Sequence, residues 1–489
     1  MFRRSSGVLL HISSLPGPYG IGDIGPAARK WVDWLAGAGC RYWQILPLGP
    51  SGFGNSPYSS RSSFAGNIDL VSPDLLHAEG LIDRPEPHGE ALRVDYPVVR
   101  AAKQRMVREG HARQTPRIRD EFADFREREA GWLEPYSLYM ALNEAHGGAS
   151  WTSWDEDLRN RESAALATAS RELSRETDLH AFGQFTFYRQ LGELRGYAAE
   201  KGVEIIGDVP LYVANDSVDV WGRPELFAID PVDGEPRLIA GVPPDHFSPI
   251  GQVWGTPTYR WDIHAQEGYS WWVDRLAAFL RHADVLRIDH FTGFARYYTI
   301  DRDNTDPLSG EWLDGPGIAF FDAVRARLGD IPLIVEDPGP LGEEVERLRT
   351  ALGYPGIRVL QQAFEPDPGP MNQPDHYPEN LVVYTGTHDT DTAVGRLGSG
   401  DEGWRRRALS YTGGTAETFA PDLVSKAWES NPMIAITPLQ DLMGLGAGHR
   451  MNTPGTVDGN WEWRVPEQGP EDGLGTWLAD LNRRTGRSV

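Results

Sequence analysis

The chain has 489 residues, of which 47 are basic and 70 acidic, and its formal net charge at pH 7 is −23. This acidic balance argues against a nucleic-acid binder, whose footprint is a basic face, and against a protein that docks on anionic membranes. A composition that is 40% hydrophobic and 24% charged is typical of globular proteins and excludes disordered, collagen-like and disulfide-stapled classes. Length alone favours about three domains.

Cys40 is the only cysteine, so the chain cannot form an internal disulfide or a multi-thiolate metal site, which fits a reducing compartment. The apolar stretch near the N-terminus breaks at His11 and is too short for a signal peptide. No later run approaches the roughly 20 apolar residues of a membrane span. We therefore expect a cytoplasmic protein.

Short, near-continuous apolar runs recur along the chain and predict parallel strands that are buried on both faces. In chain order they cover residues 8–12, 42–46, 203–207, 285–288, 332–335, 358–360, 381–384 and 433–436. Helical patterns lie between several of them, at residues 26–38, 271–280 and 320–328. Eight strands that alternate with helices predict the α/β class and a (β/α)8 barrel, also called a TIM barrel.

Two gaps between strands are far longer than the roughly 30 residues of a plain strand–helix–strand unit. We expect a mainly helical insertion at residues 56–200, after the second strand, and another insertion at residues 211–283, after the third. The second carries a Gly- and Pro-punctuated loop, residues 241–256, with little helical or strand pattern, and such loops are often lids. Residues 1–489 are then one interrupted barrel.

Four predicted strands are followed closely by an acidic residue, namely Asp208, Asp289, Glu336 and Asp389. The carboxyl ends of barrel strands share one mouth, so these residues are candidates for a common site. Each alone could be a helix cap or a turn residue. Four together are electrostatically unfavourable unless function or cations compensate. Arg287 shares a strand face with Asp289, so it would lie inside the barrel, paired with Asp289 or Asp208.

Two chemistries use clustered carboxylates with few cysteines. One is glycoside transfer by a carboxylate nucleophile and a protonated carboxylic acid, and the other is an enolase-type reaction in which carboxylates bind Mg²⁺. Arg287, His290 and His388 crowd the cluster with donors, which suit sugar hydroxyls better than a dication. The residues therefore favour a sugar substrate. A non-catalytic starch-binding protein is a third hypothesis.

Seven motifs follow one another along the chain. They are SSLPGPYGIG (13–22), WQILPL (43–48), SPY with FAGN (56–67), GDVP (207–210), RIDHF (287–291), VED (335–337) and YTGTHD (384–389). Together they resemble the amylomaltases, which are the 4-α-glucanotransferases or disproportionating enzymes of glycoside hydrolase family 77 in the amylase-like clan. The resemblance spans residues 7–463. It implies a retaining α-1,4-glucan transferase on an amylase-like barrel that lacks the separate C-terminal β-domain of α-amylases.

The resemblance also implies roles for the carboxylates. Asp289 would be the nucleophile, Glu336 the general acid/base, and Asp389 the third carboxylate, which grips donor-sugar hydroxyls. Arg287 would orient Asp289. Retention requires the two working carboxyl groups to lie about 5 to 5.5 Å apart. The Asp289 charge and apolar neighbours would raise the pKa of Glu336, so that it is protonated at rest.

Further residues are expected to bind substrate. Tyr58 would stack on the donor sugar and His388 would contact it, while Asp208 matches the aspartate that holds the arginine. Asp216 lies in the same motif, and the sequence does not decide which of the two aspartates approaches substrate. The remaining candidates are His290, which could equally be a buried hydrogen-bond partner, Trp254, which could be a loop anchor, Asp245 and Phe247.

Departures from the family pattern leave every catalytic carboxylate in place. Pro338, Thr390, His246 and Thr256 replace the usual residues and bear on acceptor preference and product size. The Gly-Asn-Trp motif that contains Asn460 and Trp461 has no assigned role.

The expected partners are α-1,4-glucans (maltooligosaccharides, starch, glycogen), with glucose as an acceptor, and we expect no cofactor or metal. Aromatic platforms and a lid would favour transfer over hydrolysis by holding the acceptor and excluding water. An α-1,4-glucan hydrolase is the alternative activity. The chain is expected to be a monomer or a weak homodimer.

Overall fold

A closed barrel of eight parallel strands forms the centre of the protein. The structure is a computed structural model and describes residues 2–89, 92–244, 250–337 and 342–488. The strand order is β10-β11-β12-β1-β2-β3-β6-β9, and the Val335 N–H donates to the Pro355 carbonyl at 3.0 Å, which joins β9 to β10. The predicted (β/α)8 barrel is confirmed. The strands are β1 (Ser5–Leu9), β2 (Tyr42–Gln44), β3 (Glu204–Val209), β6 (Val285–Ile288), β9 (Leu333–Val335), β10 (Gly356–Val359), β11 (Leu381–Tyr384) and β12 (Ile434–Pro438).

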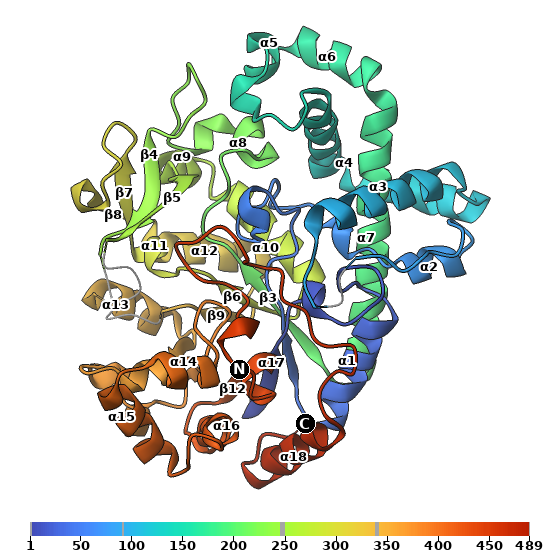
Figure 1. Ribbon diagram of the computed structural model, residues 1–489. Coiled ribbons are helices and arrows are strands. Elements are labelled where there is room, and N and C mark those ends of the chain that lie inside the picture. The colour runs from blue at the N-terminus through green and yellow to red at the C-terminus, as the bar shows by residue number, and fades with distance from the viewer. Residues whose placement is uncertain (1, 90–91, 245–249, 338–341, 489) are drawn as a thin grey trace.

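Helices cover the outside of the barrel (Figure 1). They include α1 (Pro26–Gly37), α10 (Ser270–His282), α12 (Gly317–Leu328), α13 (Glu343–Leu352), α14 (Ala393–Ser399), α15 (Glu402–Thr412), α16 (Phe419–Glu429), α17 (Leu439–Leu442) and α18 (Asp472–Arg484). The three predicted helices exist, and each turns its apolar residues inward. For example, Pro26 opens α1, and the side chains of Trp31 and Leu35 are buried against the barrel.

The segment between β2 and β3 is helical and stands above the barrel at the upper right of Figure 1. Its helices are α2 (Pro73–Ala78), α3 (Tyr96–Ala112), α4 (Pro116–Ala145), α5 (Glu156–Arg159), α6 (Ser163–Glu172) and α7 (Ser174–Glu200). The aromatic rings of Phe122, Phe182 and Phe185 pack against one another between α4 and α7. Because α7 also contacts β3, it connects this helical part to the barrel.

A second, smaller sheet lies beside the barrel mouth. Its antiparallel order is β5-β4-β7-β8. The segment after β3 supplies β4 (Leu238–Val242) and β5 (Gln252–Pro257), together with α8 (Val218–Gly222) and α9 (Trp261–Gln266). The segment after β6 supplies α11 (Thr292–Ala295), β7 (Arg296–Asp301) and β8 (Glu311–Asp314).

The expectation of an irregular loop at residues 241–256 is therefore wrong at residues 241–242 and 252–256, which are strand. These two strands, β4 and β5, pair with each other, with a register shift between Ile239 and Gly241. The other edge of β4 pairs with β7, which begins more than 50 residues after β4 ends. Local periodicity carries no signal for strands that are made by long-range, irregular pairing.

No strand follows β12 among the residues described between 439 and 488. The chain ends meet instead at the amino ends of the barrel strands, where Arg487 Nη1 donates to the Ser5 carbonyl at 3.1 Å. Within the described part of the chain, every helix is too short or too polar to cross a membrane.

Candidate active site

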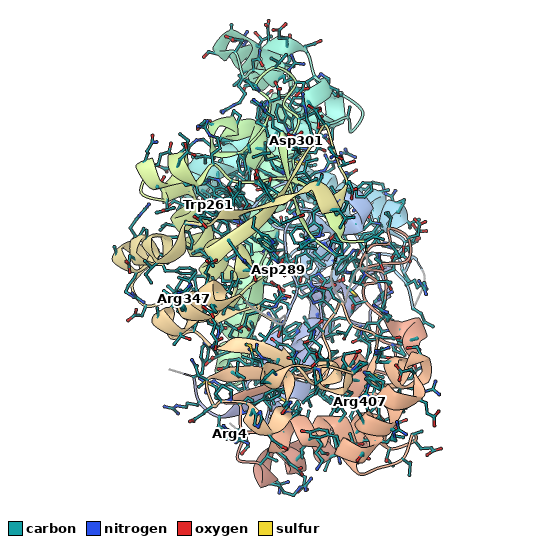
Figure 2. All side chains as sticks on the ribbon, turned by 90° about the vertical axis from the view of Figure 1, so that its left-hand side faces the viewer. Arg4, Trp261, Asp289, Asp301, Arg347 and Arg407 are labelled. Carbon is teal, nitrogen blue, oxygen red and sulfur yellow. The ribbon has the colours of Figure 1, made fainter. Side chains whose placement is uncertain are left out.

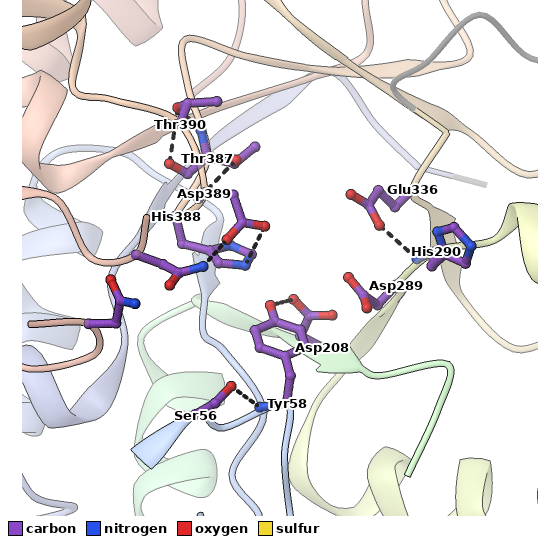
Figure 3. A network of polar contacts seen from close by, with 12 residues as sticks. Ser56, Tyr58, Asp208, Asp289, His290, Glu336, Thr387, His388, Asp389 and Thr390 are labelled. Carbon is purple, nitrogen blue, oxygen red and sulfur yellow. Dashed lines mark hydrogen bonds and ion pairs between the residues drawn. The ribbon is translucent and has the colours of Figure 1, made fainter. Parts of the chain in front are cut away.

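The carboxyl ends of β3, β6 and β9, which are neighbours in the barrel, bring three acidic side chains together. Asp208 lies on β3, while Asp289 and Glu336 directly follow β6 and β9. Asp389 comes from the loop after β11, and Figure 3 shows it facing the other carboxylates across one opening. Figure 2 places Asp289 near the middle of the molecule. The four residues predicted to share a site therefore do meet at one mouth.

Arg287 connects three of the four carboxylates. Its Nη1 donates to both carboxylate oxygens of Asp208 at 2.7 Å and to Asp289 Oδ1 at 3.0 Å, and its Nη2 lies 3.2 Å from Glu336 Oε1. The Arg287 side chain is 3% exposed and that of Asp208 0%. Burial alone would lower the pKa of Arg287, but the charges of Asp208, Glu336 and Asp289 hold it well above its usual value. One buried guanidinium thus forms ion pairs with three carboxyl groups.

Asp289 and Glu336 lie within hydrogen-bonding reach of each other, so the charge on each affects the pKa of the other. Burial and the Glu336 charge raise the pKa of Asp289 well above its usual value. Burial would raise the pKa of Glu336 too, but the Arg287 charge and the His290 backbone N–H outweigh it and lower that pKa. The expectation of a raised Glu336 pKa is wrong in this geometry. More donors face Glu336 than face Asp289, so the pKa values of the two groups move in opposite directions.

His290 acts on Glu336 through its backbone. Its φ is 48°, in the left-handed region, and its N–H donates to Glu336 Oε2 at 2.6 Å. The His290 ring packs perpendicular to Trp254, with centroids 4.9 Å apart, and Tyr212 lies 6.4 Å away. Burial lowers the pKa of His290, so the ring is neutral. Of the two roles predicted for His290, the structure shows that of a hydrogen-bond partner, because its backbone N–H binds Glu336.

Tyr58 and His388 form the opposite wall of the opening. The Tyr58 hydroxyl donates to Asp208 Oδ2 at 2.8 Å, and its ring stacks on His388 with centroids 5.2 Å apart and planes 12° from parallel. His388 Nε2 lies 3.3 Å from Asp389 Oδ2, and the Trp461 indole packs beside both rings. Burial and the Asp208 charge raise the pKa of Tyr58 well above its usual value, so its hydroxyl stays a donor. The Asp389 side chain, at 40%, is the most exposed of the four carboxylates.

Asp216 makes contacts different from those of Asp208. It accepts hydrogen bonds from the Tyr139 hydroxyl at 2.7 Å and the Trp151 N–H at 3.4 Å, and Arg61 Nη2 lies 3.7 Å away. Asp216 therefore ties the segment after β3 to the helical part. Asp208 alone of the two is bonded to Arg287.

The loop candidates divide into described and undescribed residues. Trp254 lies on β5 and packs against the ring of His290, whose backbone N–H binds Glu336. Asp245, His246 and Phe247 lie outside the described residues, as does Pro338. Thr390 Oγ1 accepts the Thr387 N–H at 2.9 Å and closes the turn that carries Asp389.

Several residues at the site escaped the sequence analysis. Asn452 and Arg450 both donate to Asp389, yet they stand more than 60 residues from it in an irregular segment. Asp337 is fully buried against Arg349 and Arg358 beside Glu336. The only sequence signal near Asn452 is the Gly-Asn-Trp motif. No cluster of three or more side chains suited to hold a metal ion occurs among the described residues.

Comparisons with known proteins agree with one another. A family model described as 4-alpha-glucanotransferase, glycoside hydrolase family 77, matches residues 10–468. The 4-alpha-glucanotransferase of Synechocystis sp. is 42% identical over 499 residues, with 100% of this chain and 99% of the relative covered. That of Thermus thermophilus is 43% identical over 486 residues, with 96% and 97% covered. An amylomaltase from Streptococcus agalactiae, solved in complex with acarbose, superposes with a TM-score of 0.96 at 36% identity over 100% of both chains.

Proposed function

The chain belongs to the 4-alpha-glucanotransferase family, and on that premise we propose that Asp289 and Glu336 perform the transfer as nucleophile and general acid/base. This proposal rests on one observation. The carboxyl groups of Asp289 and Glu336 follow the adjacent strands β6 and β9, and both contact the Arg287 guanidinium. Such close carboxyl groups favour the spacing of retaining enzymes, about 5 to 5.5 Å, over the wider spacing of inverting ones.

The first half-reaction needs a proton on Glu336 and a carboxylate on Asp289. Asp289 is the only one of the two that contacts Arg287 Nη1, which stabilises its carboxylate. Glu336 then donates that proton to the glycosidic oxygen as the C–O bond breaks, and an Asp289 oxygen bonds to the anomeric carbon. The products are a β-linked glycosyl ester and a free glucan end.

The second half-reaction reverses these roles. Glu336, now a carboxylate, takes the proton from the 4-hydroxyl of the acceptor glucan, whose oxygen attacks the anomeric carbon. The ester bond breaks, Asp289 leaves as a carboxylate, and a new α-1,4 bond forms. Two inversions at the same carbon retain the configuration. Water in place of the acceptor would give hydrolysis, but the family assignment favours transfer.

The other residues bind the donor sugar. Because the Tyr58 hydroxyl is bonded to Asp208, Tyr58 offers the face of its ring, on which a sugar can stack. Asp389 and His388 offer an exposed carboxylate and an imidazole to the hydroxyls. The amylomaltase of Streptococcus agalactiae binds acarbose, which supports an oligosaccharide as the ligand.

We assign the acceptor to the side of Trp254 and the segment at residues 241–256, since Trp254 packs on the ring of His290, whose backbone N–H binds the acid/base. In this proposal Asp245 and Phe247 contribute from the same segment. Maltooligosaccharides, starch and glycogen serve as donors, and glucose serves as an acceptor.

Maltotriose alone tests this function. The wild-type protein is expected to release glucose and build a ladder of longer oligosaccharides, and Asp289→Ala is expected to lose at least about 10⁴-fold in turnover. Asp303→Ala, which changes an aspartate that is 93% exposed, is the control and should retain full activity. Chromatography of the products over time measures both.

Each competing hypothesis has its own outcome in this experiment. Glucose release without longer products means a hydrolase. Glucan retention on a column without any new product means a binding protein. Loss of activity in EDTA that Mg²⁺ restores means a metal-dependent reaction, whereas the proposed chemistry survives EDTA. Near wild-type turnover by Asp289→Ala refutes the nucleophile assignment.

A further inference from the structure

The chain returns to the barrel mouth after its last strand. Beyond α17 and a short 3-10 helix (Ala447–His449), residues 450–465 cross the centre of the molecule as an irregular segment, drawn in red in Figure 1. Arg450 Nη2 donates to the Asp389 carbonyl at 3.0 Å, and the Asn452 N–H donates to the His388 carbonyl at 3.1 Å. The segment thus binds the backbone of the loop that carries the third carboxylate.

Asn452 also binds the Asp389 carboxylate itself. Its Nδ2 donates to Asp389 Oδ1 at 2.6 Å, while His388 Nε2 lies 3.3 Å from Oδ2. Both oxygens of an exposed carboxylate are therefore held, one by each neighbour. The side-chain torsion that would rotate the carboxylate plane is broad and soft in an unrestrained aspartate.

The Gly-Asn-Trp motif holds Asn452 in this place. Asn460 Oδ1 accepts the Thr453 N–H at 2.9 Å, and Asn460 Nδ2 donates to the Thr456 carbonyl at 2.9 Å. The Trp461 N–H donates to the Met451 carbonyl at 2.8 Å, so hydrogen bonds from the motif hold Met451 and Thr453, the residues on either side of Asn452. Asn460 is buried, which shields these bonds from water.

The motif is anchored in turn to the helical part. The Tyr96 hydroxyl, at the start of α3, donates to the Trp461 carbonyl at 2.8 Å. The Trp461 indole packs on Tyr58 and His388, whose rings face the opening. The insertion after β2 and the segment after β12 therefore meet at the loop that carries Asp389.

We infer that Asn452 is a positioning residue for Asp389 in glucan transfer, and that the Gly-Asn-Trp motif serves to keep it there. The inference rests on the proposed role of Asp389. A transition state with oxocarbenium character carries positive charge, which an Asp389 carboxylate stabilises. Asn452 is a neutral donor, so it orients this carboxylate without cancelling its charge. A lysine or arginine at the same place would orient the carboxylate but would also cancel its charge.

Two substitutions at Asn452 test the inference. Asn452→Ala removes the donor, and kcat/KM for maltotriose is expected to fall about 10- to 100-fold, mostly through kcat, because a misplaced group costs most in the transition state. Asn452→Asp conserves the shape but sets a second carboxylate against Asp389. It tests the inference even if the alanine variant fails to fold.

The pH profile of Asn452→Asp separates positioning from structure. Asp389, His388 and Arg450 are the titratable or charged groups seen against Asn452. The Asp389 charge raises the pKa of the introduced acid, and the protonated acid regains an O–H that can donate to Asp389. The ratio of variant to wild-type kcat/KM is therefore expected to rise as the pH falls from about 7.5 to about 5. A merely structural defect leaves this ratio constant.

The control is Asn380, whose Nδ2 donates to the Gly353 carbonyl at 3.1 Å just before β11 begins, at the far end of the barrel. Asn380→Ala and Asn380→Asp should match the wild type at every pH. An Asn452→Ala kcat/KM within twofold of wild type, or an Asn452→Asp ratio that does not change with pH, overturns the inference. A wild-type protein that builds no oligosaccharide ladder refutes the proposed function instead.

Discussion

Arg287 determines the charge of the site at the scale of single residues. One guanidinium contacts Asp208, Asp289 and Glu336. Its charge and the His290 N–H lower the pKa of Glu336, whereas burial and the Glu336 charge raise the pKa of Asp289. In the proposed mechanism Glu336 supplies the proton when the glycosidic bond breaks.

Glu336→Gln tests this proton at its point of use. The amide conserves the shape but cannot donate the proton, so turnover of maltotriose is expected to fall about 10²- to 10⁴-fold. An α-glycosyl fluoride needs no protonation of its leaving group and should still react, with a burst of fluoride and an ester trapped on Asp289. Rapid fluoride measurement and mass spectrometry follow these two signals.

The control for this prediction is Glu311→Gln, which alters an exposed side chain on β8 and should behave as wild type. If Glu336→Gln is slowed equally on maltotriose and on the fluoride, Glu336 is not the acid. An undiminished turnover of maltotriose leads to the same conclusion.

Single residues also show where sequence analysis reached its limit. The strand-end position of Asp289 was enough to place it at the mouth. Asp208 and Asp216 looked equivalent, and only the contacts of Arg287 and Tyr139 distinguish them. The lowered pKa of Glu336 is opposite to the expected direction. The Arg287 charge and the His290 N–H lower it, and the position of that N–H depends on one backbone angle that no residue pattern specifies.

At the scale of secondary-structure elements, Asp441 connects α17, α14 and the end of β11 behind the loop that carries Asp389. It lies on α17, accepts the Ala393 N–H of α14 at 2.6 Å and accepts the Thr385 hydroxyl just after β11 at 2.7 Å. Burial raises its pKa to about 6, and these hydrogen bonds offset only part of that effect. As the pH rises, Asp441 therefore keeps its proton longer in the folded protein than in the unfolded chain, where the pKa of an aspartate is about 3.9.

This difference predicts a pH dependence of stability. Since the folded pKa is the higher one, ionisation of Asp441 destabilises the fold as the pH rises from about 4 to about 6. Asp441→Asn cannot ionise. Relative to wild type, its free energy of unfolding should improve by up to about 3 kcal/mol between pH 4 and pH 7. Urea unfolding at both pH values measures the change.

Asp303→Asn, which removes one exposed charge, is the control for that experiment. A difference between Asp441→Asn and wild type that stays constant, or moves the other way with pH, contradicts the assignment of the raised pKa to Asp441.

The strand elements themselves were predicted closely, with one instructive shift. The first run was placed at residues 8–12, whereas β1 is Ser5–Leu9. Ser5 and Ser6 are polar, so they lie outside the apolar run, yet both are buried in β1. The Ser5 hydroxyl donates to the Arg3 carbonyl at 2.8 Å, and the Ser6 hydroxyl donates to Asn482 Oδ1 on the last helix at 2.6 Å. These hydrogen bonds make the two polar residues acceptable in the core.

At the scale of the whole molecule, catalysis and closure of the chain lie at opposite ends of the barrel. Figure 2 shows Arg4 at the lower end and Asp289 near the middle. Arg487 donates to the backbone carbonyls of Ser5, Trp428, Ser430, Pro432 and Met433, at distances from 2.7 to 3.1 Å. One buried side chain thus joins the last residues to the first and last barrel strands.

Arg487→Ala is expected to destabilise the protein without changing its chemistry. The loss of the bonds to buried carbonyls should lower the free energy of unfolding by roughly 3 kcal/mol. The values of kcat and KM at moderate temperature should stay at wild type, because the carboxylates are at the other end. Thermal unfolding and maltotriose kinetics check the two halves of this prediction.

Arg483→Ala is the matched control. Arg483 lies on the exposed side of α18, its side chain is 66% exposed, and its pair with Asp480 is a surface ion pair of small value. Equal stability of the Arg487 and Arg483 variants would show that the chain ends do not hold the barrel together.

The sequence by itself determined the barrel and the place of its chemistry. Eight apolar runs can only be buried together, and an acidic residue after such a run lies at the mouth, since strand direction and side-chain alternation are local properties. Only the tertiary structure decided the raised pKa of Asp289, the choice of Asp208 over Asp216 as the partner of Arg287, the small antiparallel sheet and the contact of Asn452 with Asp389. These features depend on contacts between segments far apart in the chain, where local periodicity has no influence.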